Sequence, residues 1–288
     1  MVRALSATVA EVVDVRRLAG GVDAATHAVR LDPGGWVVVK RVAPGHAKSL
    51  EREFTRLEFA QRAPIPTPEP ITLDTDGSWF GHPALVMSLL PGRSIFHQES
   101  GPWIDGLARA LAAVHWTQID SGVPEILRAP HAGLAWEPPP ATELPRSARI
   151  DALIETGLSL REAPGDGPEV LLHHDFHHGN VLWHGHQVTG VLDWNEARLG
   201  PPDCDVAYCS VDIAMTHGLD ASEQFIAAYS VASARLSDLR RWQCLWTANA
   251  MRWIKYWITG LHEASIQLSL PTARRRLEEL ADHVLTER

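Results

Sequence analysis

The chain is poor in cysteine and has no long hydrophobic run. Its 288 residues include only three cysteines, which lie within a short part of the second half at Cys204, Cys209 and Cys244. This number is too small for a disulfide framework, so we expect a protein of the reducing cytoplasm. No stretch approaches the roughly 18 apolar residues of a membrane span. Charges interrupt the N-terminal segment too early for a signal peptide, and we expect no membrane partner.

Basic residues are also few relative to acidic ones. The formal net charge is −9, from 26 Lys and Arg against 35 Asp and Glu. Residues 1–91 are balanced with 10 of each, so the remainder, with 16 basic and 25 acidic residues, holds the whole excess. This balance makes nucleic acid a poor candidate partner. It suits a cationic small molecule, or it serves solubility alone. We expect a monomer or a homodimer.

The N-terminal third has the pattern of an antiparallel sheet. Aliphatic and β-branched residues dominate three short segments, Val12–Leu18, Thr26–Leu31 and Trp36–Val42, as is typical of strands. Glycine-rich turns separate them, and the first turn contains Gly20 and Gly21. Because glycine has no Cβ, this turn could bring backbone N–H groups close to phosphate, or it could be a plain hairpin turn.

One charged residue stands in the third predicted strand and another in the helix that follows. Lys40 alternates with Val38 and Val42 and shares their face, so it either points into a cleft or protects an edge strand from aggregation. The spacing of apolar residues predicts a helix over Ser49–Arg62, and Glu53 lies beside its apolar stripe. Glu53 could therefore pair with Lys40, or it could be solvated.

The pattern of apolar residues changes from strand-like to helix-like near Pro91 and Gly92, which indicates two lobes, 1–91 and 92–288. Two more strands precede the change, at Ile71–Leu73 and Ala84–Leu89, and helical patterns follow it. The helices are expected at Trp103–Trp116, Ser147–Glu162, Ser222–Ala234, Leu236–Gly260 and Pro271–Arg288, with a proline-rich surface loop over Pro124–Pro145. Four tryptophans, at positions 242, 246, 253 and 257, share one face of the fourth helix, which is more typical of a core than of a ligand site.

The most informative stretch is Leu171–Ala197, LLHHDFHHGNVLWHGHQVTGVLDWNEA. Two apolar runs around a short polar turn predict a β-hairpin. Asp175 and Asn180 lie in the loop before the first strand, and Asp193 follows the second strand. Two carboxylates and a carboxamide at the ends of rigid strands suit Mg²⁺ and a transferred phosphoryl group.

The order of these features resembles the protein-kinase-like phosphotransferases, in particular their aminoglycoside phosphotransferase and choline kinase branch. HHDFHHGNVL and VLDWNEA are the specific parts, and LEREFTRLEFA, IPTPEPI and LVMSLLPGRSI look like the linking segments of that family. The resemblance implies an α+β fold with a small antiparallel β lobe, which carries one main helix, and a larger, mostly helical lobe. It also implies a kinase that uses Mg²⁺ and ATP, or GTP, to phosphorylate a hydroxyl of a small molecule.

The resemblance implies a role for each matching residue. Asp175 would be the catalytic carboxylate, and Asn180 and Asp193 would hold Mg²⁺. Lys40, paired with Glu53, would hold the ATP phosphates. The nucleotide would also be contacted by Gly20, Gly21, Met87, Ser88 and Leu89. The catalytic loop would be supported by His173 and Asp205.

The substrate is less defined than the reaction. The acidic second lobe favours an aminoglycoside or a similar antibiotic, with Glu196, Asp203 and Asp212 as candidate partners of its ammonium groups. The tryptophans would equally suit a more apolar compound, and the family also contains kinases of macrolides, choline, homoserine and sugars. A catalytically silent nucleotide-binding module is an alternative. A zinc hydrolase is another, but the spacing of the six histidines between His173 and His186 fits no standard ligand set.

Overall fold

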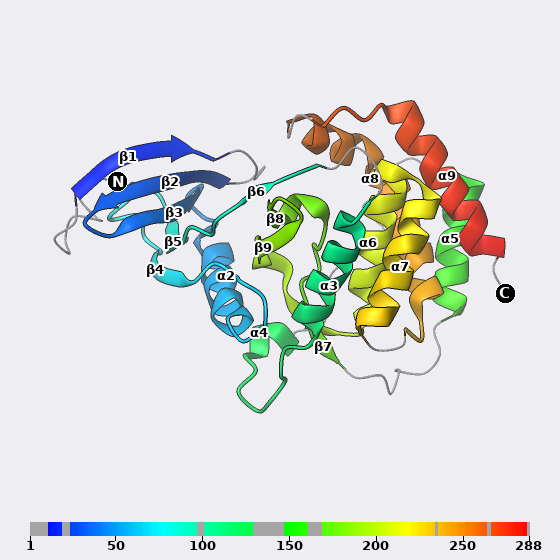
Figure 1. Ribbon diagram of the computed structural model, residues 1–288, viewed down its shortest axis with the longest axis horizontal. Helices are drawn as coiled ribbons and strands as arrows, with labels where there is room; N and C mark the ends of the chain where they lie inside the picture. The colour runs from blue at the N-terminus through cyan, green and yellow to red at the C-terminus, as the bar shows by residue number, and fades with distance from the viewer. Residues whose placement is uncertain are drawn as a thin grey trace.

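The computed structural model describes residues 11–18, 24–96, 101–128, 147–160, 169–233, 236–263 and 266–286. These residues form a small lobe built on a sheet and a larger lobe built on helices (Figure 1). The predicted α+β, two-lobe architecture is confirmed. Gly20, Gly21 and most of the proline-rich stretch Pro124–Pro145 lie outside the described residues.

The small lobe contains a five-stranded antiparallel sheet of order β1-β2-β3-β5-β4. Its strands are β1 (Glu11–Arg17), β2 (Ala24–Asp32), β3 (Gly35–Val42), β4 (Pro70–Asp74) and β5 (Ala84–Ser88). Lys40 lies in the central strand β3, opposite Thr26 of β2 and Leu85 of β5. The interpretation of Lys40 as a lysine that protects an edge strand is therefore wrong, because β3 pairs with β2 on one side and with β5 on the other.

The main helix of the small lobe, α2 (Ala47–Ala60), confirms the predicted helix with both ends shifted by two residues. Its inner face buries Glu53 among the apolar residues Leu50, Leu57, Phe59 and Ala60. The helix contacts β4 and β5 on one side and the short helix η3 (Trp194–Glu196) of the large lobe on the other. A carboxylate on such a face needs a charged partner, since burying an unpaired charge is very unfavourable.

The linker between the lobes ends in a short strand that already belongs to the large lobe. This strand, β6 (Arg93–Ser94), pairs with β8. Gly92 has a φ of 105°, and a Cβ there would collide with Thr189 Oγ1 and the carbonyl of Trp183. Glycine is therefore required where the linker crosses the hairpin. We propose the lobe boundary here, between residues 91 and 92.

The predicted hairpin is present as β8 (Val181–His184) and β9 (Gln187–Val191), in a sheet of order β6-β8-β9. A second small sheet pairs β7 (Val170–Leu172) with β10 (Arg198–Gly200). The loop of Asp175 follows β7, and the loop of Asp193 follows β9. The backbone N–H of Leu192 donates to the carbonyl of Asn180 at 2.8 Å, so the two loops are tied together.

The rest of the large lobe is helical (Figure 1). Its helices are α3 (Trp103–His115), α4 (Glu125–Arg128), α5 (Ala148–Ser159), α6 (Pro202–His217), α7 (Leu219–Ala232), α8 (Leu239–Glu263) and α9 (Leu270–Thr286). The predicted helices are confirmed with ends displaced by a few residues. The central helix α6 has no predicted counterpart, because nearly every residue from Pro202 to Thr216 is buried and no polar stripe marks its period.

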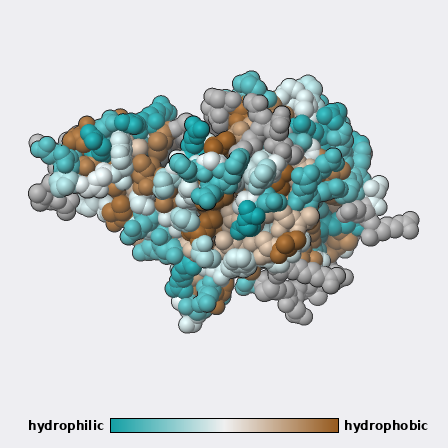
Figure 2. Space-filling model, in the orientation of Figure 1, coloured by the Kyte–Doolittle hydropathy of each residue, from teal (hydrophilic) through white to brown (hydrophobic). Residues whose placement is uncertain are grey.

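The surface view shows hydrophilic residues over much of the visible face, with hydrophobic residues in scattered groups (Figure 2). Single exposed apolar residues are normal on folded proteins. Among the described helices, none combines the length and the apolar character needed to cross a bilayer.

Candidate active site

Three charged residues that are distant in sequence meet between the lobes. Lys40 Nζ lies 2.9 Å from Glu53 Oε1 and 3.2 Å from Asp193 Oδ1. The strand β3, the helix α2 and the loop after β9 each supply one of them. The side chains of Lys40 and Glu53 are only 13% and 3% exposed, whereas Asp193 is 39% exposed. The small lobe thus presents a lysine whose ammonium is fixed from two sides.

The electrostatics of this group keep the lysine charged. Burial by itself would lower the pKa of Lys40, but Glu53 and Asp193 outweigh it and raise that pKa. Burial would likewise raise the pKa of Asp193, but Lys40 reverses the direction and the pKa is lowered. Burial does raise the pKa of Glu53, although Lys40 opposes it. A cation held in this way is suited to phosphate oxygens.

The backbone of Asp193 adopts an unusual conformation. Its φ of 60° and ψ of 66° place a non-glycine residue in the left-handed region. Its Oδ1 accepts a hydrogen bond from Asn195 Nδ2 at 2.8 Å, in addition to the contact with Lys40. Such conformations persist where surrounding contacts enforce them, and they are common at functional sites.

The second group of polar residues surrounds Asp175. Its Oδ1 accepts a hydrogen bond of 2.6 Å from the Tyr208 hydroxyl, and its Oδ2 accepts one of 3.1 Å from Asn180 Nδ2. The same amide nitrogen donates to the carbonyl of Asp175 at 3.0 Å. Both hydrogen bonds use the nitrogen of the Asn180 carboxamide. The oxygen of the same group accepts no hydrogen bond from the described residues, so it is available to a cation.

Buried residues hold the loop of Asp175 from behind. Asp205 has no exposed surface and accepts the backbone N–H groups of His173 and His174 at 2.7 and 2.9 Å. His173 Nδ1 accepts the N–H of Asp175 at 3.3 Å, so its Nε2 carries the proton donated to the carbonyl of Leu192 at 2.7 Å. Burial lowers the pKa of His173, which favours this neutral form. The ring therefore links the loops of Asp175 and Asp193.

Replacing Asp205 by alanine should destabilise the protein strongly. Two buried N–H groups would lose their acceptor, and such losses cost about 1–3 kcal/mol each. We therefore expect the free energy of unfolding in urea to fall by roughly 3 kcal/mol. Asp205→Asn keeps one acceptor oxygen and should lose less, and Asp151→Ala, at an exposed position of α5, should be near neutral. An Asp205→Ala protein as stable as the unaltered chain would contradict this support role.

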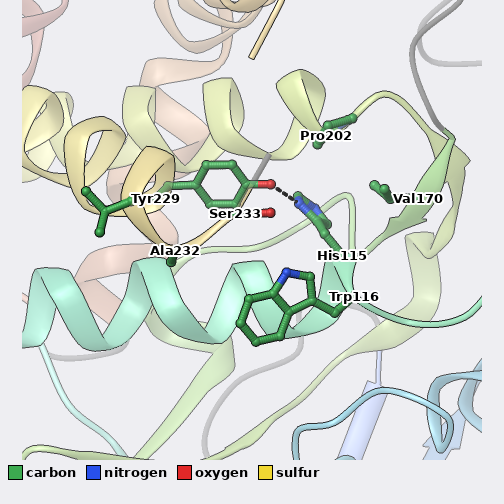
Figure 3. Close-up of a pocket in the computed structure, with 8 residues that line it drawn as sticks. His115, Trp116, Val170, Pro202, Tyr229, Ala232 and Ser233 are labelled. Atoms are coloured by element: carbon green, nitrogen blue, oxygen red, sulfur yellow. Dashed lines mark hydrogen bonds between the residues drawn. The ribbon is translucent and has the colours of Figure 1, made fainter. Parts of the chain in front are cut away.

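A pocket of about 370 Å³ lies at the C-terminal ends of α3 and α7. In Figure 3 the Tyr229 hydroxyl points at the ring of His115, and their atoms lie 2.7 Å apart. The other ring nitrogen of His115 is 3.4 Å from Asp205 Oδ2. His115 therefore links the Tyr229 hydroxyl to the same Asp205 oxygen that accepts the N–H of His173.

The three candidate substrate carboxylates are separated by the fold. Asp212 lies on α6 one turn after Tyr208, and its Oδ2 is 2.8 Å from His178 Nδ1. Glu196 is exposed and pairs with Arg198 at 2.9 Å. Asp203 is buried and accepts the backbone N–H of Asp238 at 2.7 Å. Of the three, the structure places Asp212 nearest to the Asp175 loop and turns Asp203 into a structural contact.

The residues of the lobe junction that are predicted to contact the nucleotide lie at the end of β5 and directly after it. Met87 is buried in the core, and Leu89 is 38% exposed. Ser88 pairs with Glu69 in both directions: its N–H donates to the Glu69 carbonyl, and its hydroxyl accepts the Glu69 N–H, each at 2.9 Å. This double contact fixes the start of the linker. Gly20 and Gly21 lie outside the described residues, so their predicted contact with phosphate remains a prediction.

Sequence reasoning missed two residues of this region, Tyr208 and His115. Tyr208 follows Asp205 by three positions and precedes Asp212 by four, which is the spacing of one helix face. A helix predicted over α6 would therefore have grouped it with both aspartates. His115 gives no such signal, since it ends an apolar helix and its partner Asp205 is 90 residues away.

The histidine-rich sequence does not form a metal cluster in the described part of the chain. No group of three His, Cys, Asp or Glu side chains there is arranged to hold a metal ion. His173 turns to Leu192, whereas His178 turns to Asp212. The hypothesis of a zinc hydrolase therefore gains no support from these residues.

Comparison with known proteins identifies the family. The sequence model of the phosphotransferase enzyme family (APH) matches residues 14–244. The match spans both polar groups described above and most of the chain. The chain therefore belongs to the phosphotransferase enzyme family, whose members phosphorylate small molecules.

Solved structures share the fold at low sequence identity. The apoenzyme of macrolide 2′-phosphotransferase MphH from Brachybacterium faecium is 18% identical, with a TM-score of 0.63 over 100% of this chain and 98% of that one. Amicoumacin kinase hAmiN, solved in complex with AMP-PNP, Ca²⁺ and Ami, is 15% identical, with a TM-score of 0.61 over 93% of this chain and 88% of that one. At these identities the likeness establishes the two-lobe kinase fold.

A curated relative is a much longer protein. Acyl-CoA dehydrogenase family member 10 of Mus musculus is 28% identical over 182 residues, which are 56% of this chain and 16% of that protein. The chain thus spans about a sixth of the length of this relative.

Proposed function

We propose that the chain is an ATP- and Mg²⁺-dependent kinase that transfers the γ-phosphate to a hydroxyl of a small molecule. The observation that carries the proposal is the meeting of Lys40, Glu53 and Asp193, tied through Leu192 and His173 to the loop of Asp175 and Asn180. The complex of the similarly folded amicoumacin kinase with AMP-PNP and Ca²⁺ supports a nucleotide and a divalent cation in such a fold.

The residues present fit Mg²⁺. The oxygen of the Asn180 carboxamide is left available by the hydrogen bonds of its nitrogen. The Asp193 carboxylate is partly exposed and has a lowered pKa, so it is ionised at neutral pH. Both are hard oxygen ligands of the kind that Mg²⁺ takes. Bound there, Mg²⁺ would neutralise charge on the phosphates.

The protein's own groups account for the remaining chemistry. Asp175 orients the acceptor hydroxyl and accepts its proton as the oxygen bonds to the γ-phosphorus. The bond from that phosphorus to the β–γ bridging oxygen breaks, and ADP leaves with the electron pair. Lys40 is held by Glu53 and offers its positive charge to the phosphates. The acceptor is a small molecule such as an aminoglycoside or another hydroxylated antibiotic or metabolite.

A binding and turnover experiment tests this function. The protein should bind ATP with Mg²⁺ present and much more weakly without it, as measured by calorimetry. In a panel of hydroxylated antibiotics and metabolites, at least one compound should gain a phosphate, seen as ADP release and as an added mass of one phosphoryl group. Absence of nucleotide binding with Mg²⁺ would refute the kinase. Binding without any phosphorylated product would favour the silent nucleotide-binding module.

A further inference from the structure

The pocket at the C-terminal ends of α3 and α7 has the size of a ligand site. Its volume of about 370 Å³ lies within the range of roughly 300–1,000 Å³ that is typical of small-molecule sites. In Figure 3, His115 and Trp116 line it from the end of α3 and Tyr229 lines it from α7, while Val170 of β7 and Pro202 of α6 complete it. None of its lining residues is assigned above to the nucleotide, the metal ion or the acceptor.

Two strongly exposed apolar side chains flank this pocket. Among the exposed large apolar side chains that the structure describes, Val231 and Trp116 are the two most exposed, at 90% and 57%. Val231 belongs to α7 and Trp116 directly follows α3, and both line the pocket. Scattered apolar residues on a surface are ordinary, but apolar residues that gather at a hollow are typical of a binding site. The concave shape favours a small molecule as the occupant.

The polar groups of the pocket form a chain that ends in Ser233. The Tyr229 hydroxyl lies 2.7 Å from His115 Nδ1, and the other nitrogen of that ring faces Asp205. Burial raises the pKa of Tyr229 to about 12, although a hydrogen bond from Ser233 opposes the rise, so the hydroxyl is neutral at physiological pH. Since the Ser233 hydroxyl gives its proton to Tyr229, its oxygen can accept an N–H or O–H group of a ligand.

The charge of the pocket restricts what it can hold. The residues that line it in the described part of the chain include no lysine and no arginine. A ligand with a carboxylate or a phosphate would lose water on entering and would gain no cationic partner, which is unfavourable. The pocket is therefore unsuited to a second nucleotide.

We propose that this pocket binds a flat, apolar ring compound that carries one N–H or O–H donor and no carboxylate or phosphate. The ring packs on the Trp116 indole and covers apolar surface that is now in contact with water, which provides the favourable free energy. The donor reaches the oxygen of Ser233. This site is separate from the phosphoryl transfer proposed above and does not depend on it.

Indole is a suitable probe, because it is a flat apolar ring with one N–H donor. Its binding to the full chain is measured by titration with saturation-transfer NMR. We expect saturable binding with a dissociation constant below about 1 mM, as a ligand of this size allows. 1-Methylindole lacks the donor and should bind about fivefold more weakly. Indole-3-acetate carries a carboxylate and should bind at least tenfold more weakly. Equal affinity of the three compounds, or no saturable binding of indole, would overturn the proposal.

Variants show whether indole occupies this pocket. Trp116→Ala removes a wall and Ala232→Phe fills the space from α7, so each should weaken indole binding about tenfold. Trp79→Ala removes a tryptophan that is 50% exposed on the small lobe and should change nothing. The thermal unfolding midpoint of the same samples reports the fold. Unchanged affinity in either folded pocket variant, or displacement of indole by Mg²⁺–ADP, would overturn the proposal.

Discussion

Replacing Asp175 by asparagine should lower kcat by about 10²- to 10⁴-fold, the range associated with a positioned acid or base. Asparagine has nearly the same shape but cannot accept the proton of the acceptor hydroxyl. Its carbonyl oxygen can still accept the hydrogen bond that Tyr208 now donates to Oδ1. We therefore expect the KM for ATP and the thermal unfolding midpoint to change little, which ADP-release kinetics and a melting curve would check.

A matched control uses an aspartate outside the site. Asp151 is exposed in the first turn of α5, and Asp151→Asn should retain full activity. If Asp175→Asn also retained full activity, Asp175 would not be the residue that receives the hydroxyl proton. If it lost stability along with activity, the loss would reflect the loop instead of the chemistry.

Replacing Lys40 by methionine should lower kcat/KM by about 10²- to 10³-fold, the scale of a lost electrostatic contact to a developing charge. The side chain keeps its length and apolar stem but loses the ammonium group that Glu53 and Asp193 hold. Single-turnover and steady-state rates with ATP measure the effect. Full activity in Lys40→Met would show that the lysine assignment is wrong.

The single variant also leaves Glu53 buried beside Asp193 without a cation, so part of its effect could come from instability. The double variant Lys40→Met with Glu53→Gln removes that stranded charge, and it should fold but remain inactive.

The pH dependence of the activity gives a further check on the lysine. Because the pKa of Lys40 is raised above 10.5, its ion pairs contribute fully below that value and are lost as the pH rises through the folded pKa. Between pH 7 and 9 the activity deficit of Lys40→Met should therefore be constant.

Local patterns were sufficient for the elements that are apolar on one side. The strand of Lys40 and the hairpin before Asp193 are short apolar runs bounded by polar turns, and the helix of Glu53 has apolar residues at helical spacing. Each was found near its predicted place. Helix α6 was missed because burial on all sides removes the polar stripe from which a helical period is recognised. That one omission hid Tyr208, which holds the side chain of Asp175.

The charge pattern was a weaker guide to the substrate. It nominated Glu196, Asp203 and Asp212 because they are acidic and near the chemistry in sequence. In the fold, Glu196 forms an ion pair with Arg198, and buried Asp203 accepts the backbone N–H of Asp238. Asp212 contacts the ring of His178. A carboxylate's availability depends on what lies within about 4 Å of it, and sequence neighbours do not report that distance.

The sequence by itself determined the two-lobe architecture, the hairpin and the family. The spacing of apolar residues and the order of the segments HHDFHHGNVL and VLDWNEA are local properties of the chain. Only the tertiary structure decided that Lys40 and Asp193, 153 residues apart, lie 3.2 Å from each other. It also decided that Trp246 and Trp257 of α8 pack against Tyr208, whose hydroxyl donates to Asp175. Such contacts depend on how distant elements pack, and no periodic pattern within one segment encodes them.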